Sequence, residues 1–302
     1  MTDIKKVRKI DLHCHVLAFP ELAVKRPNGT NYLSVEEQIE VHDKVGVDFG
    51  VILPIIAPEA HWTCIGNEQA QIVVNKHPDR FTWFCNIDAR QGKYTENSDL
   101  AHIAFQYKEK GAKGVGEIMT TLYADDPMMQ NLFYACSELK MPALFHVAPC
   151  KGGTYGIIDD LGLPRIEKML KKFPNLTFIG HSACFWSEIS ADNTEETRSE
   201  YPQGNVREGR IAELMREYGN LHCDLSAGSG SNAMMRDPEY AAKFLTEFAD
   251  RIFYGADVCT PGKTFQYEFI DFLEKLVLEK GLSIDNYEKI MYKNAEKLLG
   301  LN

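Results

Sequence analysis

The feature that most constrains the fold is a series of eight short apolar runs spread along the whole chain of 302 residues. Each run is rich in β-branched, aromatic or other apolar residues and is bounded by turn-forming residues, as is typical of a buried strand. Apolarity is nearly continuous within the runs, which favours parallel strands covered by helices. The runs are residues 9–16, 49–56, 81–88, 113–119, 142–148, 176–183, 221–227 and 252–258.

Segments with helical end signals separate most of these runs. Ser34 and Glu37 have the spacing of a capping box, and Gly46 is a stop signal for the same helix. Alternating strands and helices imply parallel strands with crossover helices, and eight units favour an α/β fold, a (β/α)8 TIM barrel, as a single domain over 1–302. The predicted helices are 34–46, 66–77, 127–140, 164–173, 206–218, 237–249, 264–280 and 287–299.

The composition and charge limit the classes of partner that the protein is expected to bind. The formal net charge of −10 argues against nucleic acid and against anionic membranes as partners. No run approaches the ~20 apolar residues of a membrane span, and the charged N-terminus lacks a signal-peptide core, so we expect a cytoplasmic protein. None of the eight cysteines forms a C-x-x-C pair, which argues against a structural zinc ribbon. The expected partner is a small-molecule substrate, and the sequence leaves homo-oligomerisation open.

His13 and His15 lie at the C-terminal end of the first run, separated by Cys14. Because side chains alternate across a strand, the two imidazoles should point to the same side and the thiol to the other. Barrel active sites lie at the C-terminal ends of the strands, and two adjacent imidazoles can form half of a zinc site. An isolated pair of this kind is a weak signal.

Three more ligand-type residues end other apolar runs: His146 the fifth, His181 the sixth and Asp257 the eighth. One of them alone would be read as a core residue bonded to the backbone, but five at the same end of separate strands favour a divalent metal site. Such an ion lowers the pKa of bound water to about 7. We expect Asp257 to act as general base and His181 to stabilise charge on the substrate oxygen.

The ordered motifs resemble the amidohydrolase superfamily. More narrowly, they look like the amidohydrolase-related group that includes aminocarboxymuconate-semialdehyde decarboxylase and resorcylate decarboxylases. The resemblance covers essentially the whole chain and is specific for the superfamily, but not for the reaction. It rests on Asp11–His15, His146 after the fifth strand, Ile179–Ser182, Tyr254–Asp257 and the closing segment Asn294–Leu301.

The resemblance implies zinc or another divalent first-row metal, as one or two ions. In one-metal members it implies that His181 orients or deprotonates the bound water or the substrate, or joins the ligands. The remaining implied ligands are His13, His15, His146 and Asp257.

In two-metal members, a lysine or glutamate of the fourth strand bridges the ions. Here Glu117 stands in Gly116–Ile118, which resembles the same place in TatD-type deoxyribonucleases. The following Met119–Thr121 departs from that family, which favours a single dominant ion. Glu117 is therefore a candidate ligand whose bridging role stays open.

Substrate contacts should come from the loops at the C-terminal ends of the strands. Tyr155 follows the fifth strand and Trp186 the sixth, and either ring could pack on a planar substrate. His61 is a weaker candidate for the same role. Packing of the loops themselves explains these aromatic residues equally well.

Four functions are compatible with these residues. The leading hypothesis is a metal-dependent hydrolase of a small-molecule amide, ester or lactone, with a metal-activated water and Asp257 as general base. The alternative is a metal-dependent non-oxidative decarboxylase of an aromatic or unsaturated carboxylic acid. A TatD-like nuclease is disfavoured by the acidic charge, and a non-enzymatic binding protein by the complete ligand set.

Overall fold

A computed structural model of the chain describes residues 3–60, 62–262 and 265–301. Every one of the eight predicted runs contains a strand. Short extra strands β2 (Val16–Leu17), β3 (Leu33–Ser34) and β8 (Ile157–Ile158) lie in the connections. The main strands are β1 (Ile10–Cys14), β4 (Phe49–Ile52), β5 (Phe81–Trp83), β6 (Val115–Ile118), β7 (Ala143–Ala148), β9 (Phe178–His181), β10 (Leu221–Asp224) and β11 (Ile252–Phe253).

The main strands form a parallel barrel, which confirms the predicted fold. They pair in the orders β1-β4-β5 and β6-β7-β9-β10-β11. Backbone hydrogen bonds join the two sheets at both seams. The Cys85 N–H donates to the Gly114 carbonyl at 2.9 Å, between the ends of β5 and β6. The Leu12 N–H donates to the Tyr254 carbonyl at 3.0 Å, between β1 and the end of β11.

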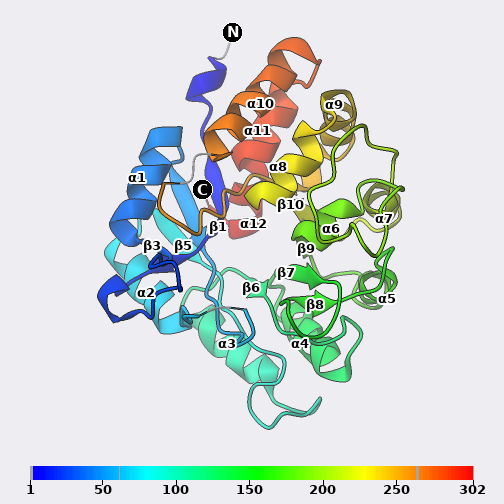
Figure 1. The fold of residues 1–302 in the computed structure, drawn as a ribbon. Coiled ribbons are helices and arrows are strands. Elements are labelled where there is room, and N and C mark those ends of the chain that lie inside the picture. Colours follow the sequence, from blue (N-terminus) through cyan, green and yellow to red (C-terminus); the bar gives the residue numbers. More distant parts are fainter. Residues whose placement is uncertain (1–2, 61, 263–264, 302) are drawn as a thin grey trace.

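Helices surround the strands (Figure 1). The capping box is present: the Ser34 hydroxyl accepts the Glu37 N–H, the Glu37 carboxylate accepts the Ser34 N–H, and Gly46 ends the helix with φ 70°. The helices are α1 (Val35–Val45), α2 (Asn67–Lys76), α3 (Leu100–Glu109), α4 (Pro127–Glu138), α5 (Pro164–Lys172), α6 (Ala183–Ser187), α7 (Arg210–Glu217), α8 (Ala227–Met235), α9 (Pro238–Glu247), α10 (Phe265–Glu279), α11 (Ile284–Glu288) and α12 (Asn294–Leu299).

Three helices, α3, α6 and α8, were not predicted. The start of α3 does carry a signal, since the Asp99 side chain accepts the His102 N–H. In α8, two glycines and two serines give a poor helical propensity. Packing overrides it: a Cβ at Gly230 would lie 2.3 Å from the Leu225 carbonyl oxygen, so this turn of helix needs glycine.

The two largest apolar clusters of the described residues divide the barrel core. The larger lies between strands and helices, and the smaller takes alternating strand residues such as Leu12, Val51, Leu144 and Ile179, together with α12. This division follows from the period of two along a strand, which sends neighbouring side chains to opposite faces. The barrel interior is therefore filled, and the chemistry is confined to its C-terminal opening.

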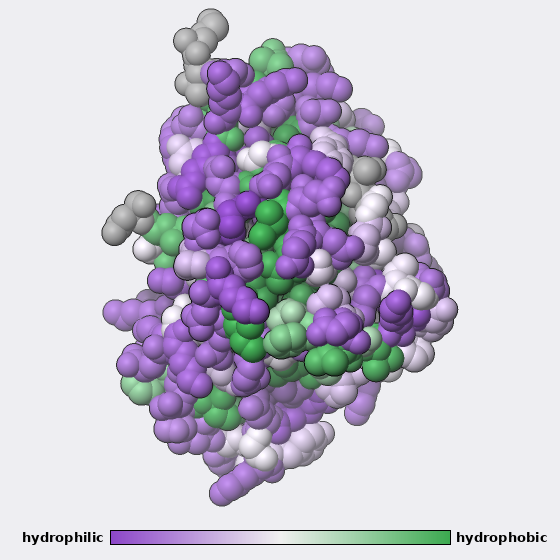
Figure 2. All heavy atoms as spheres, turned by 90° about the vertical axis from the view of Figure 1, so that its left-hand side faces the viewer, coloured by the Kyte–Doolittle hydropathy of each residue, from purple (hydrophilic) through white to green (hydrophobic). Residues whose placement is uncertain are grey.

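The face that carries α1 and α2 is mainly hydrophilic, with hydrophobic side chains in smaller patches (Figure 2). None of the helices in the described parts of the chain has the length and apolarity needed to cross a membrane.

Candidate metal centre

The predicted histidines meet at the C-terminal opening of the barrel. His13 and His15, at the end of β1, are 0 % and 2 % exposed, and their Nε2 atoms lie 3.1 Å apart. His181 ends β9, with its ring centroid 4.5 Å from that of His13, and His146 of β7 lies 5.4 Å from His181 by the same measure. Sequence positions far apart thus supply one compact set of imidazoles.

Glu117, at the end of β6, lies in the middle of this set. Its Oε2 atom is 3.2 Å from Nε2 of both His13 and His15. Its Oε1 atom is 2.7 Å from Nδ1 of His146 and 3.8 Å from Nε2 of His181. The two oxygens of one buried carboxylate therefore face two different pairs of histidines.

Asp257 completes the ring from the segment after β11. Its N–H donates to the His13 carbonyl, and its backbone has φ 50°, a left-handed conformation that aspartate tolerates better than most residues. Its Oδ1 lies 3.6 Å from Nε2 of His15, and its Oδ2 lies 3.8 Å from Nε2 of His181. The Cys259 thiol donates to Oδ1 at 2.8 Å. Asp257 thus contacts members of both histidine pairs.

Asp224, at the end of β10, was missed by the sequence analysis. Its Oδ2 accepts a hydrogen bond from Nδ1 of His13 at 2.6 Å and one from the Ser226 hydroxyl at 2.8 Å. The same hydroxyl lies 3.0 Å from Nδ1 of His181. A signal was present, because Asp224 is an acidic residue within an apolar strand, as Asp257 is at the end of another.

These outer partners orient the imidazoles. Nδ1 of His13 is held by Asp224, and Nδ1 of His15 donates to the Leu53 carbonyl at 2.8 Å. Both rings are therefore fixed with Nε2 directed at the carboxylate of Glu117. Metal-binding histidines commonly have such a partner on the other ring nitrogen.

Three carboxylates lie close to His13, and the charges of the site shift the pKa values of its members. Burial disfavours the charged form of His13, but Asp257, Glu117 and Asp224 outweigh burial and hold its pKa well above the usual value. Burial likewise opposes ionisation of Glu117, yet the charge of His13 and the hydrogen bonds from the histidines hold its pKa well below the ordinary range. Burial and the nearby His13 lower the pKa of His181 to about 4.

The donor set fits a divalent ion. Imidazole nitrogens and carboxylate oxygens are the ligands of zinc and of other first-row ions. Within each of several trios, the ligand atoms lie within 4.8 Å of one another. These trios are His13–His15–Glu117, His13–His181–Asp257, Glu117–His146–His181 and His15–Asp257–Cys259.

The two aromatic candidates lie in different surroundings. The Tyr155 ring is 4.6 Å from the His146 ring, and Tyr155 lines a pocket of about 550 Å³. Trp186 is 2 % exposed, and its indole N–H donates to the Asp224 carbonyl at 2.9 Å. Tyr155 thus borders open space beside the metal centre, whereas Trp186 supports a strand end. His61 lies outside the described residues.

A larger cavity of about 860 Å³ opens at the opposite, N-terminal end of the barrel, next to His222 and Phe253. None of the metal-centre residues lines it. Cavity size therefore does not locate the chemistry, and the smaller pocket is linked to the metal centre through Tyr155, whose ring lies 4.6 Å from the His146 ring.

An eight-stranded barrel with histidines and carboxylates gathered at the C-terminal ends of its strands defines a metal-dependent barrel enzyme. The chain belongs to the amidohydrolase family, whose model matches residues 10–301. None of the curated proteins compared with the chain matches it.

Solved structures agree with this fold. An uncharacterised TIM-barrel protein from Bordetella bronchiseptica is 20 % identical, with 97 % of this chain and 98 % of that chain covered and a TM-score of 0.67. A probable 2-pyrone-4,6-dicarboxylic acid hydrolase from Acinetobacter baumannii is 13 % identical, covering 97 % and 99 %, with a TM-score of 0.59. A dihydroxybenzoic acid decarboxylase from Polaromonas, with bound manganese and an inhibitor, is 17 % identical, covering 97 % of each chain, with a TM-score of 0.55.

Proposed function

We propose that the protein is a metal-dependent hydrolase of an amide, ester or lactone bond in a small molecule. One observation carries the proposal: the buried Glu117 carboxylate directs one oxygen at His13 and His15 and the other at His146 and His181. The orienting carboxylate of Asp224 faces histidines with Oδ2 alone, whereas Glu117 faces them with both oxygens. A carboxylate shared between two sets of imidazoles is the arrangement expected where ions are held for hydrolysis.

The same arrangement bears on the number of ions. The residues after Glu117 favour a single dominant ion, but its two oxygens face separate ligand sets, and this geometry supports two. His13 and His15 with Glu117 Oε2 would hold one ion. His146 and His181 with Glu117 Oε1 would hold the other.

Each residue has a definite task in the proposed reaction. When bound, a divalent ion supplies Lewis acidity that activates water and polarises a carbonyl. Asp257 lies within reach of both ligand sets and is 14 % exposed at its side chain, so it can accept a proton and return it to a leaving group. His181, with Nδ1 beside the Ser226 hydroxyl, presents Nε2 toward Asp257; where a single ion is held by His13 and His15, this nitrogen is left to stabilise charge on a substrate oxygen.

Tyr155 is the substrate contact that the geometry supports best. Its ring borders both His146 and the pocket of about 550 Å³, whose lining also includes Arg90, Thr121 and Lys151. Arg90 is paired with Asp88 and Glu59, so Lys151 is the lining cation that favours a substrate with a carboxylate or a similar acidic group. A cytoplasmic location and a homo-oligomeric state stay predictions.

Decarboxylation of an aromatic or unsaturated acid is the second candidate, because several of the similar structures are decarboxylases of aromatic acids, among them 2,6-dihydroxybenzoate and 5-carboxyvanillate decarboxylases. A panel of lactones, esters, amides and aromatic acids, incubated with the metal-loaded enzyme in ¹⁸O-labelled water, separates the two. Hydrolysis places ¹⁸O in the product carboxylate, whereas decarboxylation releases carbon dioxide and leaves the organic product unlabelled. Carbon dioxide release without ¹⁸O incorporation, at a rate abolished by Asp257→Asn, would replace the first candidate by the second.

A further inference from the structure

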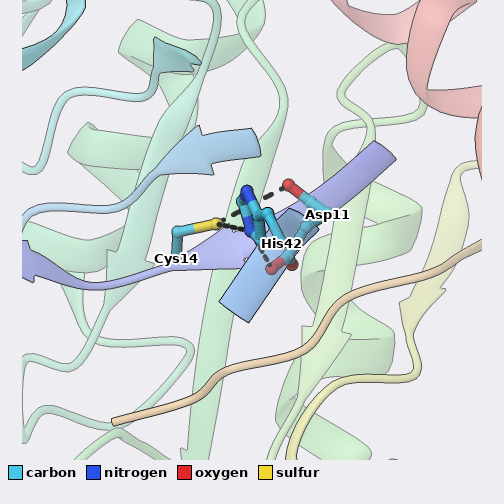
Figure 3. Close-up of side chains that lie close together, drawn as sticks. All are labelled: Asp11, Cys14 and His42. Carbon is cyan, nitrogen blue, oxygen red and sulfur yellow. Dashed lines mark hydrogen bonds and ion pairs between the residues drawn. The ribbon is translucent and has the colours of Figure 1, made fainter. Parts of the chain in front are cut away.

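Three side chains meet outside the metal centre, between β1 and α1: Asp11, Cys14 and His42 (Figure 3). All three are 0 % exposed. Nε2 of His42 lies 3.1 Å from Oδ2 of Asp11 and 3.6 Å from Sγ of Cys14. The side-chain amide of Gln38, one helical turn earlier, lies 2.8 Å from the same imidazole nitrogen. The pairing of β1 with β4 shifts register between Asp11 and Cys14, and both side chains contact the helix.

The other oxygen of Asp11 reaches the metal centre. Oδ1 accepts the N–H of His13 at 2.9 Å and the N–H of Ala256 at 2.8 Å. His13 is a candidate ligand, and Ala256 precedes Asp257, which is another. One carboxylate therefore ties the backbone at two ligand positions to each other across the seam between β1 and β11.

We infer that His42 is a positioning residue, which holds the Asp11 carboxylate so that His13 and Asp257 keep the spacing needed to bind metal. The inference rests on the proposed metal centre. His42 touches none of the candidate ligands itself; it acts through Asp11. If its imidazole is lost, the buried Oδ2 of Asp11 loses its histidine partner. The carboxylate must then turn or take up a proton, and the two backbone N–H groups lose their fixed acceptor.

Packing alone does not account for a histidine at this position. Nδ1 of His42 is buried and has no hydrogen-bond partner among the described residues. An unsatisfied buried polar atom destabilises the folded protein. A methionine would fill the same space between α1 and β1 without that cost, so the imidazole is explained by its contact with Asp11.

Metal affinity is the test, since a merely structural residue would leave it unchanged in the folded protein. Zinc would be titrated against a chromophoric chelator in wild type, His42→Met, His42→Gln and His222→Met, with melting temperatures measured on the same metal-free samples. Glutamine keeps an N–H near the place of the imidazole Nε2. His222 is the matched control, because its Nδ1 is also buried without a partner in the described structure, but it lies at the opposite end of the barrel.

We expect His42→Met to weaken zinc binding ~10–100-fold, the usual worth of an outer partner of a metal ligand, with His42→Gln within ~threefold of wild type and His222→Met unchanged. If His42→Met does not fold, His42→Asn replaces it, since its shorter amide falls short of Asp11. Wild-type zinc affinity in His42→Met, or equal weakening in His222→Met, would overturn the inference. So would a loss of one full equivalent of zinc at otherwise unchanged affinity, because the cluster would then hold its own ion. Failure of wild type to bind zinc at all would instead refute the metal centre itself.

Discussion

Metal removal should destabilise the folded protein; the charges of the site set the direction of the effect, and the metal concentration relative to Kd sets its size. Two buried carboxylates, Glu117 and Asp224, and the partly exposed Asp257 surround one imidazole, His13, whose pKa they raise. They therefore leave net negative charge in the barrel opening unless a cation is bound. Because the metal binds the folded chain, saturation at 100 times Kd adds about 2.7 kcal/mol to the free energy of unfolding. For a chain of 302 residues that corresponds to a rise in Tm of roughly 4 °C.

The assay is thermal unfolding of chelator-treated protein with stepwise addition of zinc or manganese. The control is His13→Ala combined with His15→Ala, which removes two ligands and leaves the carboxylates in place. We expect the Tm of wild type to rise with the logarithm of metal concentration and the Tm of the double variant to rise less, because only His146, His181 and Glu117 are left to hold an ion. An unchanged wild-type Tm, or an equal rise in both proteins, would refute this reasoning.

Three further predictions concern single residues. Asp257→Asn keeps one oxygen ligand but removes the basic site, so metal content should fall only moderately while turnover falls by ~10²–10⁴; a metal-loaded variant with normal turnover would exclude a proton carrier. His146→Ala should lose metal and activity together, as measured by metal analysis and turnover of one preparation. In metal-free protein, burial and His13 lower the pKa of His181 from 6.5 to about 4, so the unfolded chain binds this proton first as the pH falls. The contribution of this group to the free energy of unfolding is complete above pH 6.5 and is lost toward pH 4. His181→Gln should therefore flatten that part of the plot of unfolding free energy, measured with urea, against pH. An unchanged plot would contradict the lowered pKa.

The barrel could be predicted because its signals are local. Eight apolar runs with turn residues at their ends identified the strands, and Ser34, Glu37 and Gly46 identified α1. The prediction missed α8, where packing overrides the local helix propensity. This helix contains two glycines and two serines, and it forms because Gly230 fits against the Leu225 carbonyl.

The ligands could be named from strand ends, but their mutual geometry could not. The sequence does not show that the oxygens of Glu117 would face different histidine pairs, since this depends on the stagger of β6 against β1 and β7. Asp224 was not predicted because, unlike His13, it is not followed by a second histidine or carboxylate at the end of its strand. The contact between His42 and Asp11 joins residues of a helix and a strand that are 31 positions apart in the sequence, and no sequence motif indicates it.

Anomalous diffraction from crystals of the metal-loaded protein tests the central claim most directly. We predict two peaks about 3.5–4 Å apart, the spacing of two-metal sites, one beside His13 and His15 and the other beside His146 and His181, with Glu117 between them. A single peak among these residues would contradict the shared carboxylate. The absence of any peak within ligand distance of His13, His15 and Glu117, in protein shown to be folded and metal-saturated, would contradict the metal centre.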